Sequence, residues 1–135
     1  MCRRVVVTGM GAVTPLGLSV EESWESAVAG KSVAAEIRQF DASGFPVRFA
    51  CELPGFEVQK FIDAREARKM DPHTQYGVAA SLMAWKDSGL DQGGVEPERA
   101  GVLIGSGVGG IQTLENQHTV LMEKGPRRIS PFFIP

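Results

Sequence analysis

The chain has 135 residues, of which 43% are apolar and 22% are charged, and these proportions predict a single globular domain. Fourteen Lys and Arg against 16 Asp and Glu give a formal net charge of −2, which disfavours a general nucleic-acid binder because such proteins carry a basic surface. No run approaches the roughly 20 apolar residues that span a bilayer, and two cysteines with two histidines are too few for a disulfide framework or a metal cluster, so we expect a cytoplasmic protein with no membrane span.

The first part of the chain predicts a strand, a loop and a helix. Residues 3–8 form a short β-branched run, which is typical of a strand buried on both faces. Residues 9–17 contain glycines and a proline and predict a loop. A helix is expected over residues 19–30, because Ser19 and Glu22 have the spacing of a capping box and a glycine ends the segment.

The middle of the chain predicts mainly helix. Residues 47–51 carry a weak extended pattern, and residues 56–70 suit one short helix or two helical turns. Asp71 is expected to cap the next helix, with Pro72 in its first turn. That helix extends to residue 89 and is apolar on nearly all sides, which predicts that it is buried.

The last part of the chain again predicts a strand, a loop and a helix. Residues 100–104 suit a second short buried strand, residues 105–110 a glycine loop and residues 111–122 a helix. Residues 124–135 contain three prolines and predict a loop. Strands that alternate with helices indicate an α/β fold class, and we see no internal repeat or linker that would divide the chain.

The second glycine loop matches a known nucleotide-binding pattern. Gly105, Gly107 and Gly110 have the G-x-G-x-x-G spacing with which backbone N–H groups at a helix start hold a pyrophosphate. That fingerprint normally opens the first strand–helix unit and has an acidic residue about 20 positions later, where this chain has the basic segment 124–128. A dinucleotide-binding domain is therefore one hypothesis, and glycines that allow close backbone packing are the other.

Two clusters of basic residues stand out in an acidic chain. The first has i, i+3, i+4 spacing, which places its members on one side of a helix: Arg65, Arg68 and Lys69. The second lies in the C-terminal loop and comprises Lys124, Arg127 and Arg128. The clusters indicate either a solvated surface or a docking site that attracts an acidic partner.

The reactive side chains suggest no catalytic constellation. Cys2 is terminal, and Cys51 stands beside Glu52, whose carboxylate disfavours a thiolate. His73 falls in the first turn of a helix, and His118 lies on a partly exposed helix surface. We therefore predict no nucleophile–base pair and no metal-ligand spacing from these residues.

Several motifs in a fixed order resemble the β-ketoacyl-acyl-carrier-protein synthases. They are VVVTGMGAVTPLG at 5–17, REARKMD at 65–71, QYG at 75–77, DSGL at 87–90, GSGVGG at 105–110 and GPRRISPFFIP at 125–135. The likeness extends through the whole chain and is strongest to the elongating synthases of bacterial type II systems.

This resemblance implies a partial thiolase-like fold, which is layered α/β/α/β/α in the full enzyme. Residues 1–135 would be the incomplete N-terminal part of the synthase N-terminal domain. The family is usually homodimeric and elongates fatty acids by decarboxylative Claisen condensation: an acyl group moves from acyl carrier protein to a cysteine, and decarboxylating malonyl-carrier protein attacks it. No metal, nucleotide or other cofactor is implied.

The resemblance also implies roles for individual residues. The family's cationic surface for acyl carrier protein corresponds to Arg65, Arg68, Lys69, Arg127 and Arg128. Val108 corresponds to the residue that gates the acyl pocket. Phe133 and Ile134 correspond to residues that line this pocket from across the dimer interface.

The family's nucleophilic cysteine and its two catalytic histidines belong to motifs that residues 1–135 do not contain. No catalytic residue is therefore assigned, and the chain is expected to be an N-terminal fragment, truncated before the nucleophile and inactive alone. A polyketide-type ketosynthase or chain-length factor would share the same motifs. A carrier-protein interaction module without turnover is a further hypothesis.

Overall fold

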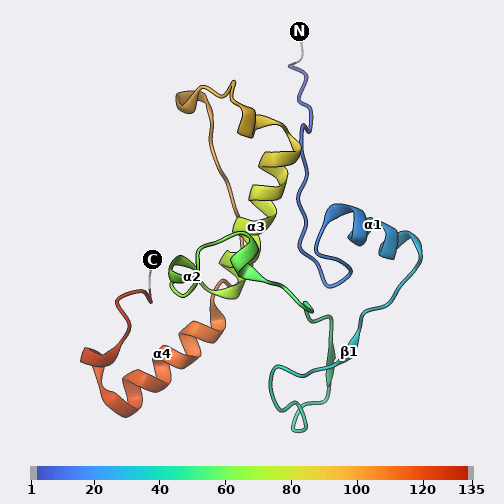
Figure 1. Cartoon of the computed structure of the whole chain (residues 1–135). Coiled ribbons are helices and arrows are strands. Elements are labelled where there is room, and N and C mark those ends of the chain that lie inside the picture. The colour runs from blue at the N-terminus through green and yellow to red at the C-terminus, as the bar shows by residue number, and fades with distance from the viewer. Residues whose placement is uncertain (1–2, 134–135) are drawn as a thin grey trace. The chain divides into compact units, whose positions relative to one another are not determined.

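The computed structural model describes residues 3–133, which divide into two compact units. The first unit combines residues 3–57 with 80–94, and the second combines residues 58–79 with 95–133. Helix α3 (Pro72–Asp87) gives its first half to the second unit and its second half to the first (Figure 1). Both units therefore draw part of their structure from one helix.

Helix α1 (Val20–Val28) begins as the sequence predicts. Ser19 Oγ accepts a hydrogen bond from the Glu22 backbone N–H at 3.2 Å, and Glu22 Oε2 accepts one from the Leu18 N–H at 2.8 Å. These bonds satisfy backbone donors that the start of a helix leaves unpaired. Gly30, at φ +66°, follows the helix in the left-handed region that glycine adopts most readily, so the predicted end is also confirmed.

Strands β1 (Ala35–Glu36) and β2 (Phe49–Ala50) pair in an antiparallel hairpin in the first unit. The register places Ala35 opposite Ala50. β2 lies within the weak extended pattern of residues 47–51, which confirms that prediction. Across the part of the chain that the structure describes, this hairpin is the only sheet.

The first glycine loop packs closely against the second half of α3. A Cβ atom at Gly9 would overlap the Ala84 carbonyl oxygen, and a Cβ atom at Gly11 would overlap the Ala80 carbonyl oxygen. Only a residue without a side chain allows the loop to approach the helix this closely. The first loop therefore shows the close backbone packing that the sequence offered as one hypothesis for the second glycine loop.

The helices of the second unit follow the predicted segments. η1 (Val58–Lys60) and α2 (Ala64–Ala67) are the two helical turns expected within residues 56–70. α3 begins at Pro72 as predicted, and α4 (Ile111–Lys124) extends two residues beyond the predicted helix. Local sequence signals therefore suffice to place these helices.

Short 3₁₀ turns connect the longer elements: η2 (Leu90–Gln92) in the first unit, and η3 (Pro97–Arg99) and η4 (Pro126–Arg128) in the second. The core is small. The buried apolar residues of the described chain are Ala42, Ile62, Ala67 and Ala79. No helix formed by residues 3–133 is both long and apolar enough to cross a bilayer.

Two predicted strands do not form in this structure, so these predictions are wrong. Residues 3–8 and 100–104 have no strand structure, and Val5 is 92% and Leu103 98% exposed. A short β-branched run becomes a strand only when a neighbour pairs with its backbone and covers its side chains. No paired neighbour lies beside either run in the described residues.

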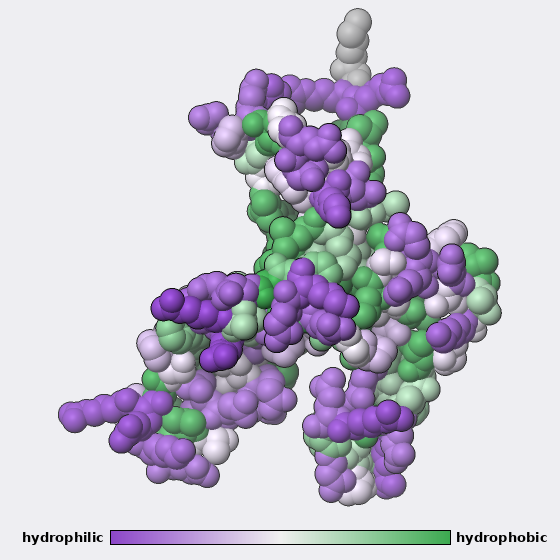
Figure 2. All heavy atoms as spheres, viewed as in Figure 1, coloured by the Kyte–Doolittle hydropathy of each residue, from purple (hydrophilic) through white to green (hydrophobic). Residues whose placement is uncertain are grey.

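The complete burial predicted for the middle helix is also wrong. Ala79 is the buried residue of α3, whereas Leu82 and Trp85 are 45% and 43% exposed. Figure 2 accordingly shows hydrophobic side chains at the surface around α3. A helix that is apolar on all sides is buried only where other layers surround it, and the described elements cover α3 only in part.

Candidate functional site

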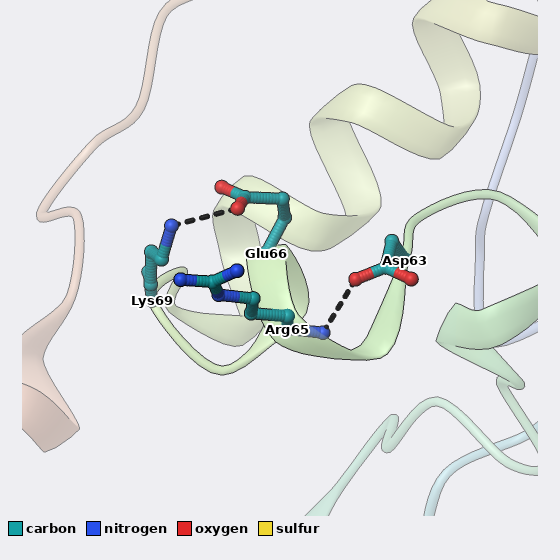
Figure 3. Close-up of polar contacts among 4 residues, drawn as sticks. All are labelled: Asp63, Arg65, Glu66 and Lys69. Carbon is teal, nitrogen blue, oxygen red and sulfur yellow. Dashed lines mark hydrogen bonds and ion pairs between the residues drawn. The ribbon is translucent and has the colours of Figure 1, made fainter.

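The first basic cluster lies in and directly after α2. Asp63 begins this helix, because its Oδ1 accepts a hydrogen bond from the Arg65 backbone N–H at 2.8 Å. Since α2 ends at Ala67, Arg68 and Lys69 follow the helix rather than sharing one long helical face with Arg65. Figure 3 shows the Arg65 and Lys69 side chains pointing to the same side of this turn.

The members of this cluster differ in their partners. Lys69 Nζ lies 2.7 Å from Glu66 Oε1 (Figure 3), and it also lies 6.0 Å from the centre of the Phe132 ring. An exposed ion pair of this kind contributes at most about 1 kcal/mol, so its main effect is to orient Lys69. Arg65 and Arg68 form no ion pair with any residue between 3 and 133.

The second basic cluster lies on η4. Gly125, at φ +80°, follows α4, and its N–H donates to the Leu121 carbonyl at 3.0 Å. The chain turns there, and η4 presents Arg127 and Arg128 to solvent. Neither arginine has an acidic partner within the described chain, so both charges are available to an anionic ligand.

A hollow of about 860 Å³ lies in the second unit. Its lining comes from the α2–α3 junction, the start of α4 and the segment after η4. The lining includes two residues predicted to bind a carrier protein, one predicted to gate the acyl pocket and one predicted to line that pocket from across the dimer interface: Arg68, Lys69, Val108 and Phe133. The structure therefore brings these four together on one chain, while Ile134 lies outside the described residues.

Two hydrogen bonds connect separate segments at this hollow. Thr113 Oγ1 donates to Asp71 Oδ1 at 2.5 Å, and the Ser130 N–H donates to Gln117 Oε1 at 2.7 Å. The sequence predicted Asp71 as a helix cap, and it predicted no contact for Thr113, Gln117 or Ser130. Because Asp71 and Thr113 are 42 residues apart, no local pattern could have indicated their contact.

The second glycine loop differs from a dinucleotide site in its surroundings. The fingerprint requires a strand directly before the glycines, and residues 100–104 form none. Ser106 Oγ instead accepts a hydrogen bond from the Gly109 N–H at 3.0 Å, which closes the loop on itself. Val108 is 77% exposed and faces the hollow that it helps to line.

The remaining reactive side chains belong to different segments of the chain. Cys51 is an exposed free cysteine, while Cys2 lies outside the described residues. His73 Nε2 lies 3.3 Å from the hydroxyl oxygen of the neighbouring Thr74. Within residues 3–133, no group of three or more His, Cys, Asp or Glu residues is placed to hold a metal ion.

Comparison with known proteins gives consistent matches over nearly the whole chain. Residues 2–135 match the family model of the β-ketoacyl synthase N-terminal domain. The 3-oxoacyl-[acyl-carrier-protein] synthase 2 of Vibrio cholerae is 48% identical over 133 residues, which are 98% of this chain and 32% of that protein. The chain therefore spans about a third of the length of the curated relatives that it matches.

Solved structures agree with this match. A β-ketoacyl synthase from Burkholderia phymatum has a TM-score of 0.78 and 28% identity over 98% of this chain and 33% of its own. A type II polyketide acyl carrier protein in complex with its ketosynthase bound to the hexaketide has a TM-score of 0.71 and 29% identity, over 94% of this chain and 33% of that one. These likenesses confirm the predicted fold class, a part of an α/β, thiolase-like fold.

Proposed function

Because the chain belongs to the β-ketoacyl synthase family, we propose that it forms the carrier-docking part of a 3-oxoacyl-[acyl-carrier-protein] synthase of fatty-acid elongation. In this reaction malonyl-carrier protein loses CO₂, and the resulting carbanion attacks an acyl thioester on an enzyme cysteine, whose thiolate leaves. Residues 1–135 supply recognition of the carrier and of the acyl chain, and the family's cysteine and histidine motifs supply the chemistry.

One observation carries this proposal: Arg68, Lys69, Val108 and Phe133 line a single hollow. A carrier protein delivers its acyl group on a flexible arm, so its docking surface has to border the mouth of the acyl pocket. Cationic side chains beside apolar ones provide this combination. The resemblance implies carrier binding for Arg68 and Lys69, gating of the acyl pocket for Val108, and a place on the pocket wall across the dimer interface for Phe133.

The electrostatics support an acidic partner. Arg65, Arg68, Arg127 and Arg128 are exposed, and none forms an ion pair within residues 3–133. Each exposed contact would stabilise a complex by only about 0–1 kcal/mol. Several positive charges on one unit would instead accelerate the encounter with an acidic carrier and make its rate depend on salt.

The pathway and the assembly are part of the same proposal. The curated relatives at 47–48% identity from Vibrio cholerae and Staphylococcus aureus are 3-oxoacyl-[acyl-carrier-protein] synthases 2, which supports fatty-acid elongation over polyketide synthesis. Phe132 is 53% exposed beside Phe133, and this apolar segment would be covered in a homodimer. We assign the enzyme to the cytoplasm, where the carrier-bound substrates of such systems occur.

The decisive experiment reverses the charge of η4 in the complete synthase. Arg127→Glu combined with Arg128→Glu should lower the association rate for acyl carrier protein about tenfold at low salt, with a smaller difference at high salt. Stopped-flow fluorescence with labelled carrier protein gives this rate. A matched double reversal, Arg38→Glu with Arg99→Glu, changes the same net charge at exposed positions outside the two clusters and should have little effect. Equal rates for the two double variants would refute the docking role.

A further inference from the structure

Asp71 lies between the two parts of the proposed site, which are the basic cluster at α2 and the glycine loop that carries Val108. It follows the basic cluster directly in the chain and precedes α3, and its side chain reaches across to the start of α4. Thr113 Oγ1 donates to Asp71 Oδ1 at 2.5 Å, and Thr113 is half-buried. A hydrogen bond to a carboxylate in a partly buried place is among the stronger polar contacts in proteins.

The second oxygen of Asp71 lies against the glycine loop. Gly110 precedes the first residue of α4, and a Cβ atom at Gly110 would overlap the Asp71 carboxylate. The preceding Gly109 has φ +75°, so the backbone turns sharply just after Val108. The Asp71 carboxylate therefore borders the point from which the Val108 loop leaves the helix.

Hydrogen bonds also fix Asp71 to the turn that carries Arg68 and Lys69, which we call the docking turn. Gln75 Nε2 donates to the Ala67 carbonyl at 2.9 Å and to the Met70 carbonyl at 3.1 Å. The Gln75 N–H also donates to the Asp71 carbonyl at 3.0 Å. These bonds tie the turn that carries Arg68 and Lys69 to the start of α3, so this turn and Asp71 form one connected piece.

Given the proposed function, on which this inference rests, we propose that Asp71 is a positioning residue that couples carrier docking to the choice of acyl chain. A continuous set of contacts leads from the docking turn through Asp71 to Thr113 and Gly110, and from there to Val108. A carrier protein that pulls on the docking turn thereby acts on the loop that gates the acyl pocket. Chain-length discrimination then depends on whether the acyl group arrives on the carrier protein.

The test uses the complete synthase and a conservative change. Thr113→Val removes the donor but keeps the shape of the side chain, whereas Thr113→Ser keeps the donor. Thr119→Val is the matched control, since it makes the same change on the same helix, where the hydroxyl bonds to the Glu115 carbonyl of that helix at 3.1 Å. Each variant is assayed with a long and a short saturated acyl group, carried either by acyl carrier protein or by free pantetheine.

The expected result is a loss of discrimination that requires the carrier. Thr113→Val should reduce the long-to-short ratio of kcat/KM about tenfold with carrier-bound substrates, which is the scale of a hydrogen bond to a charged group. The same ratio with pantetheine substrates should change less than about twofold. Thr113→Ser and Thr119→Val should both resemble the unmodified enzyme.

A second variant tests whether the effect of Thr113→Val comes only from a less stable helix α4. Gly110→Ala displaces the Asp71 carboxylate by direct overlap and should relax discrimination in the same carrier-dependent way. An equal change with carrier and pantetheine substrates, or no change with either, overturns the coupling. If the unmodified synthase condenses no carrier-bound substrate at all, the proposed function itself fails, and this inference fails with it.

Discussion

The two glycine loops of the chain have similar compositions and opposite surroundings. Gly9 and Gly11 lie so close to α3 that any Cβ atom would overlap helix backbone, whereas no described atom lies within contact distance of a Cβ built at Gly105 or Gly107. In the first loop, glycine removes steric bulk. In the second, Gly105 and Gly107 leave the surface of the loop open, while Gly110 lies against the Asp71 carboxylate.

The polar contacts of the two loops differ in the same way. The first loop is anchored from outside, because the Met10 N–H donates to Asp87 Oδ2 at 2.8 Å and the Thr14 and Ser23 hydroxyls lie 2.9 Å apart. The second loop closes on itself through Ser106. Glycine content alone therefore does not distinguish a closely packed loop from an open one, whereas the neighbours of each loop do.

The largest expected effect is on stability, from a side chain added where the first glycine loop packs against α3. Gly11→Ala should lower the free energy of unfolding of the complete synthase by about 1–3 kcal/mol or more, because the added methyl group meets helix backbone rather than a movable side chain. Gly105→Ala is the matched change in the open loop and should cost no more than about 0.5 kcal/mol. Chemical denaturation followed by circular dichroism measures both. Equal losses in the two loops would contradict the contrast.

A smaller effect, on substrate selection and not on stability, is expected from a change in the second glycine loop. Val108→Phe adds volume at an exposed residue that lines the hollow, so stability should stay unchanged while the longest acyl groups lose about tenfold in kcat/KM, or about 1.4 kcal/mol. Steady-state kinetics across a series of acyl lengths gives this profile. Val108→Ala should leave the long groups accepted. A uniform loss at every length would argue against a gate at Val108.

The smallest effect concerns a third loop, between β1 and β2, which is held by a carboxylate. The Ser43 backbone N–H, and to a lesser degree its hydroxyl, hydrogen-bonds to Asp41 and lowers the pKa of Asp41 below its ordinary value. A lowered pKa means that this turn is stabilised above the ordinary pKa and loses that support as pH falls through the lowered one. Titration followed by NMR should show Asp41 gaining its proton at an unusually low pH. Ser43→Ala should raise that pKa only part of the way, and a complete return would show that the hydroxyl dominates.

The sequence correctly predicts the structural features that depend on residues close together in the chain. The capping box of Ser19 and Glu22 and the glycine stop at Gly30 place α1 correctly, since each acts within a few residues. The runs at 3–8 and 100–104 carry equally clear strand signals but form no strand. Helices satisfy their own backbone hydrogen bonds, whereas strands depend on partners that are distant in sequence.

The candidate site shows the same limit. Spacing found the cationic residues, and the resemblance supplied their partner, because both kinds of information lie in short motifs. The contact between Asp71 and Thr113 joins residues 42 positions apart, and each looks ordinary in its own segment. Long-range polar contacts of this kind become visible only when the helices are in place.

The exposed run at Val5, Val6 and Val7 has a consequence for biosynthesis. These residues leave the ribosome before α1 is complete, and a β-branched stretch without a ladder partner is a favoured start for association between nascent chains. Arg3 and Arg4 stand directly before it, where paired positive charges act as gatekeepers against such association. Replacing these arginines should therefore increase association between nascent chains, and so the demand for chaperones. This effect would arise during synthesis and not during docking or gating.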